Sequence, residues 1–98
     1  MKKDEILAAL RHLTPPLKQR GVVSLVFFGS QARGDAAPNS DLDVALEVDQ
    51  RTKFSILDLV EIERFITDSV GVPANAFMKR SLDDRFVAEI ERDGISVF

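Results

Sequence analysis

Apolar and polar residues alternate in blocks along the chain, and their periods predict both helices and strands. Residues 2–13 repeat their apolar positions at helical spacing. A second short helix is expected to start at Thr14, which would cap it, and to end at Gly21. The run Val22–Phe28 is continuously β-branched and aromatic, which predicts a buried central strand. Ser30–Arg33 is expected to form a helical turn directly after it.

The middle of the chain predicts two more strands around the longest helix. Leu42–Val48 alternates strictly, so one face should enter the core while the other carries acids. Residues 55–70 have helical spacing, and 72–78 alternate again. Leu57 and Phe65 fall outside the apolar face of this helix, which leaves a partner interface and scattered surface residues as alternatives. The face expected to be buried comprises Ile56, Leu59, Val60, Ile62, Ile66 and Val70.

The C-terminal block predicts one more helix and an edge strand at 95–98. Ser81 and Asp84 have the spacing of a capping box, and Gly94 is expected to end the helix. The residues this helix would bury are Leu82, Phe86, Val87 and Ile90. The pattern as a whole predicts one α/β domain over residues 1–98, with helices flanking a small mixed β-sheet.

Composition narrows the possible functions. The 98 residues are 45% hydrophobic, which is typical of a globular chain, and the absence of cysteine excludes disulfides and zinc–thiolate sites. The net charge is −3 and no basic stripe is visible, so binding to long nucleic acid is not expected. Neither a signal peptide nor a membrane-spanning run is apparent, which predicts a cytoplasmic protein with no membrane partner.

Candidate chemistry is concentrated between the first two predicted strands. Gly29 and Ser30 form a turn whose backbone N–H groups suit phosphate oxygens. Asp41 and Asp43 are two residues apart on a strand, so their carboxylates share one face and favour a cation between them. Oxygen ligands select hard ions, here two Mg²⁺ or alternatively Mn²⁺. Arg33 is placed to bind the same phosphates.

Each of these residues also has a simpler, non-functional interpretation. Acids at a strand entrance are often surface residues, and Arg33 is alternatively a solvated loop arginine. The glycine turn is not a P-loop, because no Lys-Ser/Thr pair follows it. Arg33-Gly34-Asp35 matches an integrin tripeptide, which is a coincidence in a cytoplasmic protein. His12, the single histidine, is expected at a helix end away from the acids.

The order of these residues resembles the signature of the DNA polymerase β-type nucleotidyltransferase superfamily. Residues 29–43 read G-S, ten intervening residues, then D-L-D. The A-R-G at 32–34, Ser40, and the R-D-G-I at 92–95 resemble its minimal single-domain branch, the MNT-domain proteins. The resemblance covers most of the chain and implies the polymerase β-like nucleotidyltransferase fold.

The resemblance also implies roles for individual residues. Gly29 and Ser30 would hold the triphosphate of the incoming nucleotide, and Arg33 would contact phosphate. Asp41 and Asp43 would be the catalytic metal ligands. The implied reaction transfers a nucleoside monophosphate, AMP from ATP, to a hydroxyl acceptor. Minimal members pair with a HEPN-domain toxin and act as its antitoxin by modifying a tyrosine, so a HEPN partner is expected here.

One position departs from the family pattern. Active members carry a third carboxylate on the later strand, where the alternation of residues 72–78 places Asn75. An amide can ligate a metal but cannot act as a general base at neutral pH. The alternatives, if the register differs, are Asp68, Asp83 and Asp84. A weakened enzyme, or one with an acidic acceptor such as tyrosine, is therefore expected.

Two rival functions stay open. The chain could be a binding module that neutralises a HEPN partner by contact, with catalysis lost at Asn75. Alternatively it could modify RNA ends or antibiotics, although tailing RNA would require more basic surface or a second domain.

Overall fold

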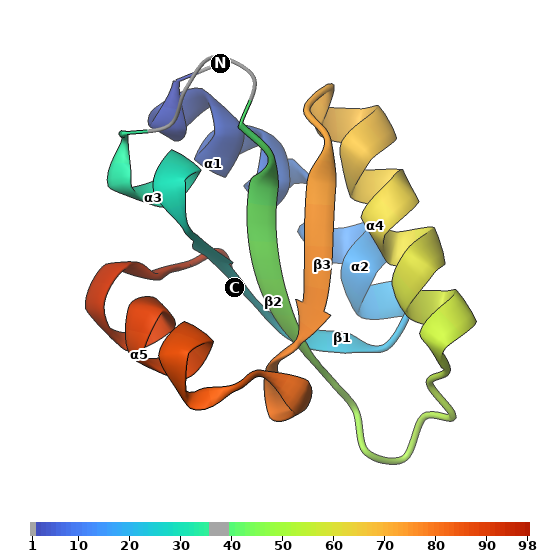
Figure 1. The fold of residues 1–98 in the computed structure, drawn as a ribbon. Coiled ribbons are helices and arrows are strands. Elements are labelled where there is room, and N and C mark those ends of the chain that lie inside the picture. The colour runs from blue at the N-terminus through green and yellow to red at the C-terminus, as the bar shows by residue number, and fades with distance from the viewer. Residues whose placement is uncertain (1, 36–39) are drawn as a thin grey trace.

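The computed structural model describes residues 2–35 and 40–98, which form a four-stranded sheet with helices (Figure 1). The elements occur in the predicted order, with one added 3-10 turn, η1. The expected loop between the first two strands falls largely on residues 36–39, outside the described part. The bounds are α1 Lys3–His12, α2 Thr14–Gln19, β1 Val22–Phe28, α3 Ser30–Arg33, β2 Leu42–Val48, α4 Ile56–Val70, β3 Ala74–Met78, η1 Lys79–Ser81, α5 Asp84–Asp93 and β4 Ile95–Ser96.

The sheet is mixed, as predicted, with strand order β3-β2-β1-β4. β1 is antiparallel to both β2 and β4, and β2 is parallel to β3. Because β2 and β3 are parallel, their connection crosses over through α4, in agreement with the long helix between them. The two strands that flank the glycine turn are therefore the two central strands.

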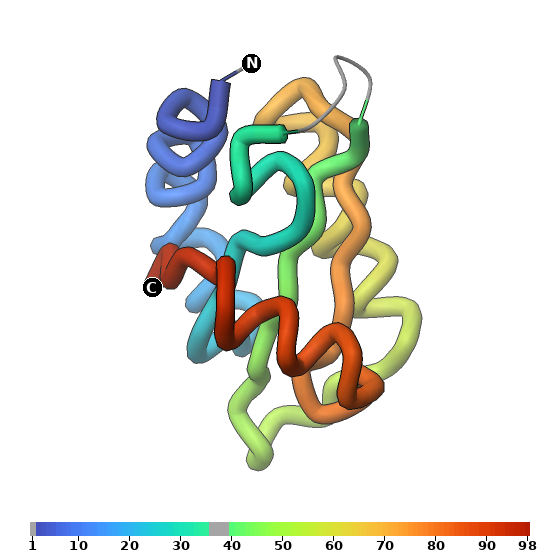
Figure 2. The backbone as a smooth tube through the Cα atoms, turned by 60° about the vertical axis from the view of Figure 1, so that its left-hand side comes forward, coloured from blue at the N-terminus to red at the C-terminus, as the bar shows by residue number. Residues whose placement is uncertain are grey.

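One face of the sheet holds the main core. The helices α1, α2 and α4 cover this face, and α4 lies along β3 (Figures 1 and 2). Alternate residues of the strands point into it, as period-two alternation requires. Its fully buried side chains include Ile6, Leu10, Leu17, Leu25, Phe27, Leu42, Val44, Leu46, Ile62 and Ile66.

The other face is only partly covered, by α5. Figure 2 shows this helix, in red, passing in front of the strands. It is anchored by an aromatic cluster, defined as Phe28, Phe77 and Phe86, with ring centroids 5.7–6.2 Å apart. Ala45 on β2 is completely buried although it belongs to the acid-bearing face. The strict division into a core face and a polar face is therefore wrong at this position, because the aromatic cluster forms a second, smaller core.

Two predicted helix starts are wrong. Thr14 is the first helical residue of α2 rather than its cap, and the cap position is Leu13, with no side-chain hydrogen bond. Pro at the start of α2 removes an N–H that would otherwise need a partner, so no capping side chain is required. Ser81 belongs to η1, and α5 is capped instead by Asp83, whose carboxylate accepts the Phe86 N–H at 3.1 Å.

The burial of two helices also differs from prediction. On α4, Ile56 and Val60 are exposed rather than buried, whereas Phe65 packs against the core. The side of α4 that carries Ile56 and Val60 is exposed, whereas Leu59 in the first turn packs against the core. On α5 no residue is fully buried, and Val87 is exposed. Helical periodicity predicted the right stripe on α5 but not how little of the sheet it covers.

Candidate functional site

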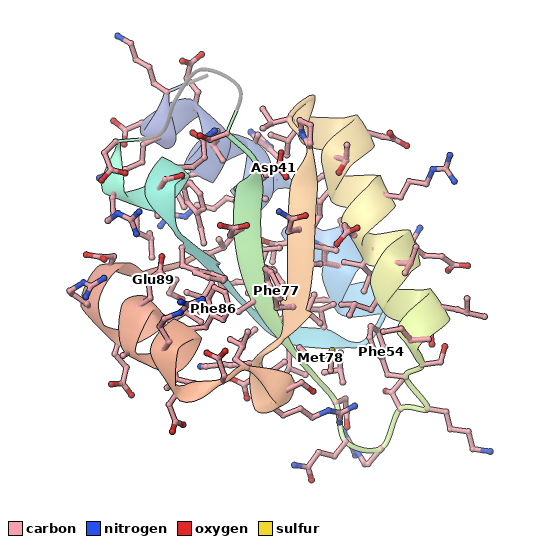
Figure 3. All side chains as sticks on the ribbon, viewed as in Figure 1. Asp41, Phe54, Phe77, Met78, Phe86 and Glu89 are labelled. Carbon is pink, nitrogen blue, oxygen red and sulfur yellow. The ribbon has the colours of Figure 1, made fainter. Side chains whose placement is uncertain are left out.

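Asp41, Asp43 and Asn75 converge at the edge where β2 and β3 begin (Figure 3, where Asp41 is labelled). Asn75 is the register partner of Asp43 on the neighbouring parallel strand. Its Nδ2 lies 3.1 Å from Asp41 Oδ2 and 3.3 Å from Asp43 Oδ1, donating to both. The three residues that the sequence assigned to catalysis are thus brought together by the register of β2 and β3.

The Asp43 carboxyl is the most perturbed acid of this group. Partial burial is the largest cause that raises its pKa above the usual value, and the charges of Asp41 and Glu89 raise it further. The amide of Asn75 and the charge of Arg33 act in the opposite direction. When the pKa of a carboxyl group is raised in this way, the protein alone stabilises its negative charge poorly. A bound cation would stabilise the charged form.

Gly29 lies directly against Asp43. It adopts φ +82°, and a Cβ built on it would stand 2.5 Å from Asp43 Oδ2. Any larger residue would strain the backbone and collide with the carboxylate. Glycine is therefore required for two independent reasons, and the turn and the acid pair form one continuous surface.

The turn after β1 is fixed by a buried glutamine that the sequence analysis did not single out. Ser30 begins α3, a helix of one turn, and is half-buried beside Gly29. Gln31 is only 9% exposed, and its Nε2 donates to the Ser40 carbonyl at 2.8 Å. This bond ties the turn to the residue directly before Asp41, so one side chain sets the spacing between the two halves of the motif.

Arg33 is one-third exposed at the end of α3 and lies between two carboxylates. Its Nε is 3.2 Å from Asp35 Oδ2, and its Nη1 is 2.9 Å from Glu89 Oε1 on α5. These hydrogen bonds, first that to Glu89 and then that to Asp35, raise the Arg33 pKa above its already high value. Glu89 was missed by the sequence analysis, and its only signal was an acid beside the apolar stripe of the last helix.

The outer edge of β3 is supported by two side chains of α4. Glu63 Oε2 accepts the Ala76 N–H at 2.8 Å, and Thr67 Oγ1 accepts the Ala74 N–H at 3.0 Å. These residues occupy the hydrogen-bonding positions that a further strand would otherwise fill. They hold Asn75, which lies between the two bonded residues, in register with Asp43.

The alternative third carboxylates do not reach the acid pair. Asp83 is used as the cap of α5, Asp84 lies in its first turn, and Asp68 is exposed on α4. His12 ends α1 and is exposed, as predicted. Within residues 2–35 and 40–98, no group of three His, Cys, Asp or Glu side chains is placed to hold a metal ion. No helix in the same ranges is long and apolar enough to cross a membrane.

The ligand groups at this site suit a hard divalent cation. Two carboxylates and one amide meet on one face, and the carbonyl oxygen of Asn75 can replace its NH₂ by rotation of the terminal torsion. The adjacent glycine turn and Arg33 provide N–H donors of the kind that bind phosphate oxygens. The arrangement therefore fits a metal-bound polyphosphate.

Comparison with known families decides the class of protein. A family model described as "Nucleotidyltransferase domain" matches residues 4–97. The chain belongs to the nucleotidyltransferase domain family. A Methanocaldococcus jannaschii protein assigned by name to the protein adenylyltransferases is 33% identical over 96% of both chains. This membership places the chain in the nucleotidyltransferase class of enzymes.

Solved structures agree with this nucleotidyltransferase assignment. One described as a minimal nucleotidyltransferase is 28% identical, with a TM-score of 0.77 over 97% of this chain and 95% of that one. Another, described as a tri-AMPylated Shewanella oneidensis HEPN toxin in complex with MNT antitoxin, matches with a TM-score of 0.71 at 12% identity, over 95% of this chain and 71% of that one. At that identity only the fold is shared. The fold is the polymerase β-like fold of minimal nucleotidyltransferases, as the sequence predicted.

Proposed function

We propose that this nucleotidyltransferase transfers AMP from ATP to a hydroxyl group on a HEPN-domain toxin and acts as its antitoxin. The relatives named as protein adenylyltransferases support AMP as the group transferred. The complex of an AMPylated HEPN toxin with an MNT antitoxin supports this kind of partner. The Gly29–Asp43 contact is the observation that carries the proposal, because it joins a phosphate-binding turn to an acid pair.

The reaction requires positioning and charge neutralisation more than covalent help from the protein. Gly29 and Ser30 hold the triphosphate, and Arg33 binds its oxygens. Asp41 and Asp43, with the Asn75 carbonyl, would hold Mg²⁺, which would supply positive charge to stabilise the charge that develops on phosphate. The acceptor oxygen forms a bond to the α-phosphorus while the bond from that phosphorus to the bridging oxygen breaks. Pyrophosphate leaves.

Asn75 determines which acceptors are suitable. The amide cannot take the proton of the attacking hydroxyl, so that proton passes to solvent or to a group of the partner. A tyrosine hydroxyl, with a pKa near 10, loses its proton far more readily than an aliphatic alcohol. We therefore propose tyrosine as the acceptor.

Labelling of a HEPN-domain partner tests the proposal. Purified protein is incubated with the partner, Mg²⁺ and ATP labelled on the α-phosphate, and the partner should become labelled at tyrosine. ATP labelled on the γ-phosphate should transfer nothing, because that phosphate leaves with pyrophosphate. Asp41→Asn should abolish labelling, whereas Asp49→Asn, an acid beyond the far end of β2, should leave it unchanged.

Neutralisation of the toxin distinguishes catalysis from contact. If AMP transfer is the mechanism, Asp41→Asn loses both labelling and neutralisation of toxicity. If Asp41→Asn still neutralises the toxin, the chain acts as a binding module, and the proposal is wrong. Absence of labelling with any HEPN partner or nucleotide would also refute it.

A further inference from the structure

Arg33 is held from two directions by segments far apart in the sequence. Asp35, two residues away, accepts from Nε at 3.2 Å. Glu89, which is 56 residues away on α5, accepts from Nη1 at 2.9 Å. The first bond is local to the turn, but the second crosses from the last helix to the phosphate-binding turn.

The two bonds leave most of the guanidinium available. Arginine has five N–H donors in a rigid planar fork. Two of these are used by Asp35 and Glu89. Within the described part of the chain, both donors of Nη2 and one of Nη1 have no protein acceptor. The two bonds hold the guanidinium at Nε and at Nη1, which leaves the whole Nη2 amino group open to an anion.

Glu89 reaches Arg33 because α5 is anchored next to the turn. Phe86 packs against Phe28 and Phe77, and Phe28 directly precedes Gly29. Glu89 follows Phe86 by three residues, which places both on the same side of the helix. Figure 3 shows the two side chains projecting from α5 toward the sheet. The aromatic cluster thus sets the position of the Glu89 carboxylate relative to the turn.

Glu89 does not replace the missing third carboxylate. Asn75 is on β3, whereas the side chain that Glu89 bonds is Arg33, at the end of α3 and next to the glycine turn. Glu89 therefore approaches from the side of the phosphate-binding turn and is paired with its arginine. A role in placing phosphate fits this position, and a role in activating the acceptor does not.

We propose that Glu89 is a positioning residue for the nucleotide, holding the Arg33 guanidinium so that its remaining N–H donors are available to the triphosphate. This inference rests on the proposed function, since it assigns Glu89 a part in binding the same ATP. A long, partly exposed arginine samples many rotamers, and fixing it beforehand removes an entropic cost from binding. Surface ion pairs add little to stability, so the effect should be visible in binding rather than in folding.

Binding of the non-hydrolysable analogue AMP-PNP with Mg²⁺, measured by calorimetry, tests the role of Glu89. Glu89→Ala should weaken binding roughly three- to tenfold, the range expected for immobilising one such side chain. Glu89→Gln, which keeps an acceptor oxygen, should lose less. Glu91→Ala, an exposed acid on the same helix, is the matched control and should bind like the wild type. With ATP and partner, Glu89→Ala should raise KM while kcat stays nearly constant.

A double-mutant cycle tests whether Glu89 acts on nucleotide binding through Arg33. Arg33→Ala should weaken AMP-PNP binding by roughly tenfold or more, as loss of a charge-assisted hydrogen bond predicts. Adding Glu89→Ala to Arg33→Ala should cause no further loss, because Glu89 then has nothing to position.

Three outcomes would count against these proposals in distinguishable ways. Unchanged binding by Glu89→Ala would overturn the positioning role. Tighter binding would overturn it too, since Glu89 would then compete with phosphate for Arg33. Failure of the folded wild-type protein to bind AMP-PNP would refute the proposed function itself, whatever the variants do.

Discussion

On one face of the sheet, strand side chains pack against three helices, whereas on the other, among the described residues, they pack against α5 through the aromatic cluster. The first face contains most of the fully buried side chains, and none of the proposed site residues. The second face carries Asp43 and Asn75, with the exposed Asp41 directly before β2, and Arg33 lies nearby at the end of α3. Stability and chemistry are thus divided between the two faces of the same four strands.

The division has a physical cause. A site for nucleotide and metal must expose charged groups, and like charges held together destabilise the folded state. Placing them opposite a closed apolar core lets the core compensate for that cost. Substitutions on the closed face should therefore mainly change stability, whereas substitutions on the open face should mainly change activity.

The largest expected effect is on the rate of transfer from the open face. Asp43→Asn should lower kcat/KM by at least about 10³-fold, because it removes one of the two carboxylates proposed to hold the metal. Rates of ³²P-AMP incorporation into the HEPN partner measure it, with Asp49→Asn as the control. Near-normal activity of Asp43→Asn would show that this face does not bind the metal.

The next largest effect is on stability, from the closed face. Ile66→Ala should lower the free energy of unfolding by roughly 2–5 kcal/mol, because Ile66 is completely buried against the sheet. Phe86→Ala, in the aromatic cluster, should lower the free energy of unfolding by less, because no side chain of α5 is fully buried. Urea unfolding measures both, and Val60→Ala, exposed on the same helix as Ile66, should change little. A greater loss for Phe86→Ala would mean that the second face is the main core.

A smaller effect should test the role of the Asn75 amide at the site. Asn75→Asp restores the carboxylate of the family pattern and should raise the transfer rate roughly tenfold or more. Without Mg²⁺ the same change should lower stability, because a third negative charge joins Asp41 and Asp43. Initial rates and thermal unfolding with and without Mg²⁺ measure the two effects. A rate no higher than that of the wild type would show that proton removal does not limit transfer.

The smallest effect is the pH dependence of stability without metal. The pKa of Asp43 is raised in the folded protein, mainly by partial burial. The contribution of Asp43 to stability is therefore fully present below its pKa in the unfolded chain, about 3.9. It is lost as the pH rises through the higher pKa of the folded protein. Asp43→Asn should raise the melting temperature at neutral pH, and should not raise it at about pH 3.

A second aspartate provides the control of opposite sign. The hydrogen bonds from Arg51 hold the pKa of Asp49 below its usual value. Its contribution to stability is therefore present above the unfolded pKa and lost as the pH falls through the folded one. Asp49→Asn should lower, not raise, the melting temperature at neutral pH. A rise for both variants would point to net charge rather than to the Asp43 environment.

Local sequence patterns were sufficient for the elements and for the motif. Strand periodicity placed Asp43 and Asn75 on faces away from the core, and the strand alignment brings them together. The same patterns failed where an outcome depends on neighbours far away in the chain. The start of α4 has helical apolar spacing, but Ile56 and Val60 stay exposed while Leu59 packs against the core.

By itself, the sequence determined the order of helices and strands, the glycine turn and the acid pair, because each depends on residues close together in the chain. Only the tertiary structure decided what supports that motif. Gln31 connects the turn to Ser40, Glu63 and Thr67 fix the edge of β3, and Glu89 pairs with Arg33 across 56 positions. These side chains act through contacts that depend on how the strands pair and on where α5 packs, and no local period encodes either.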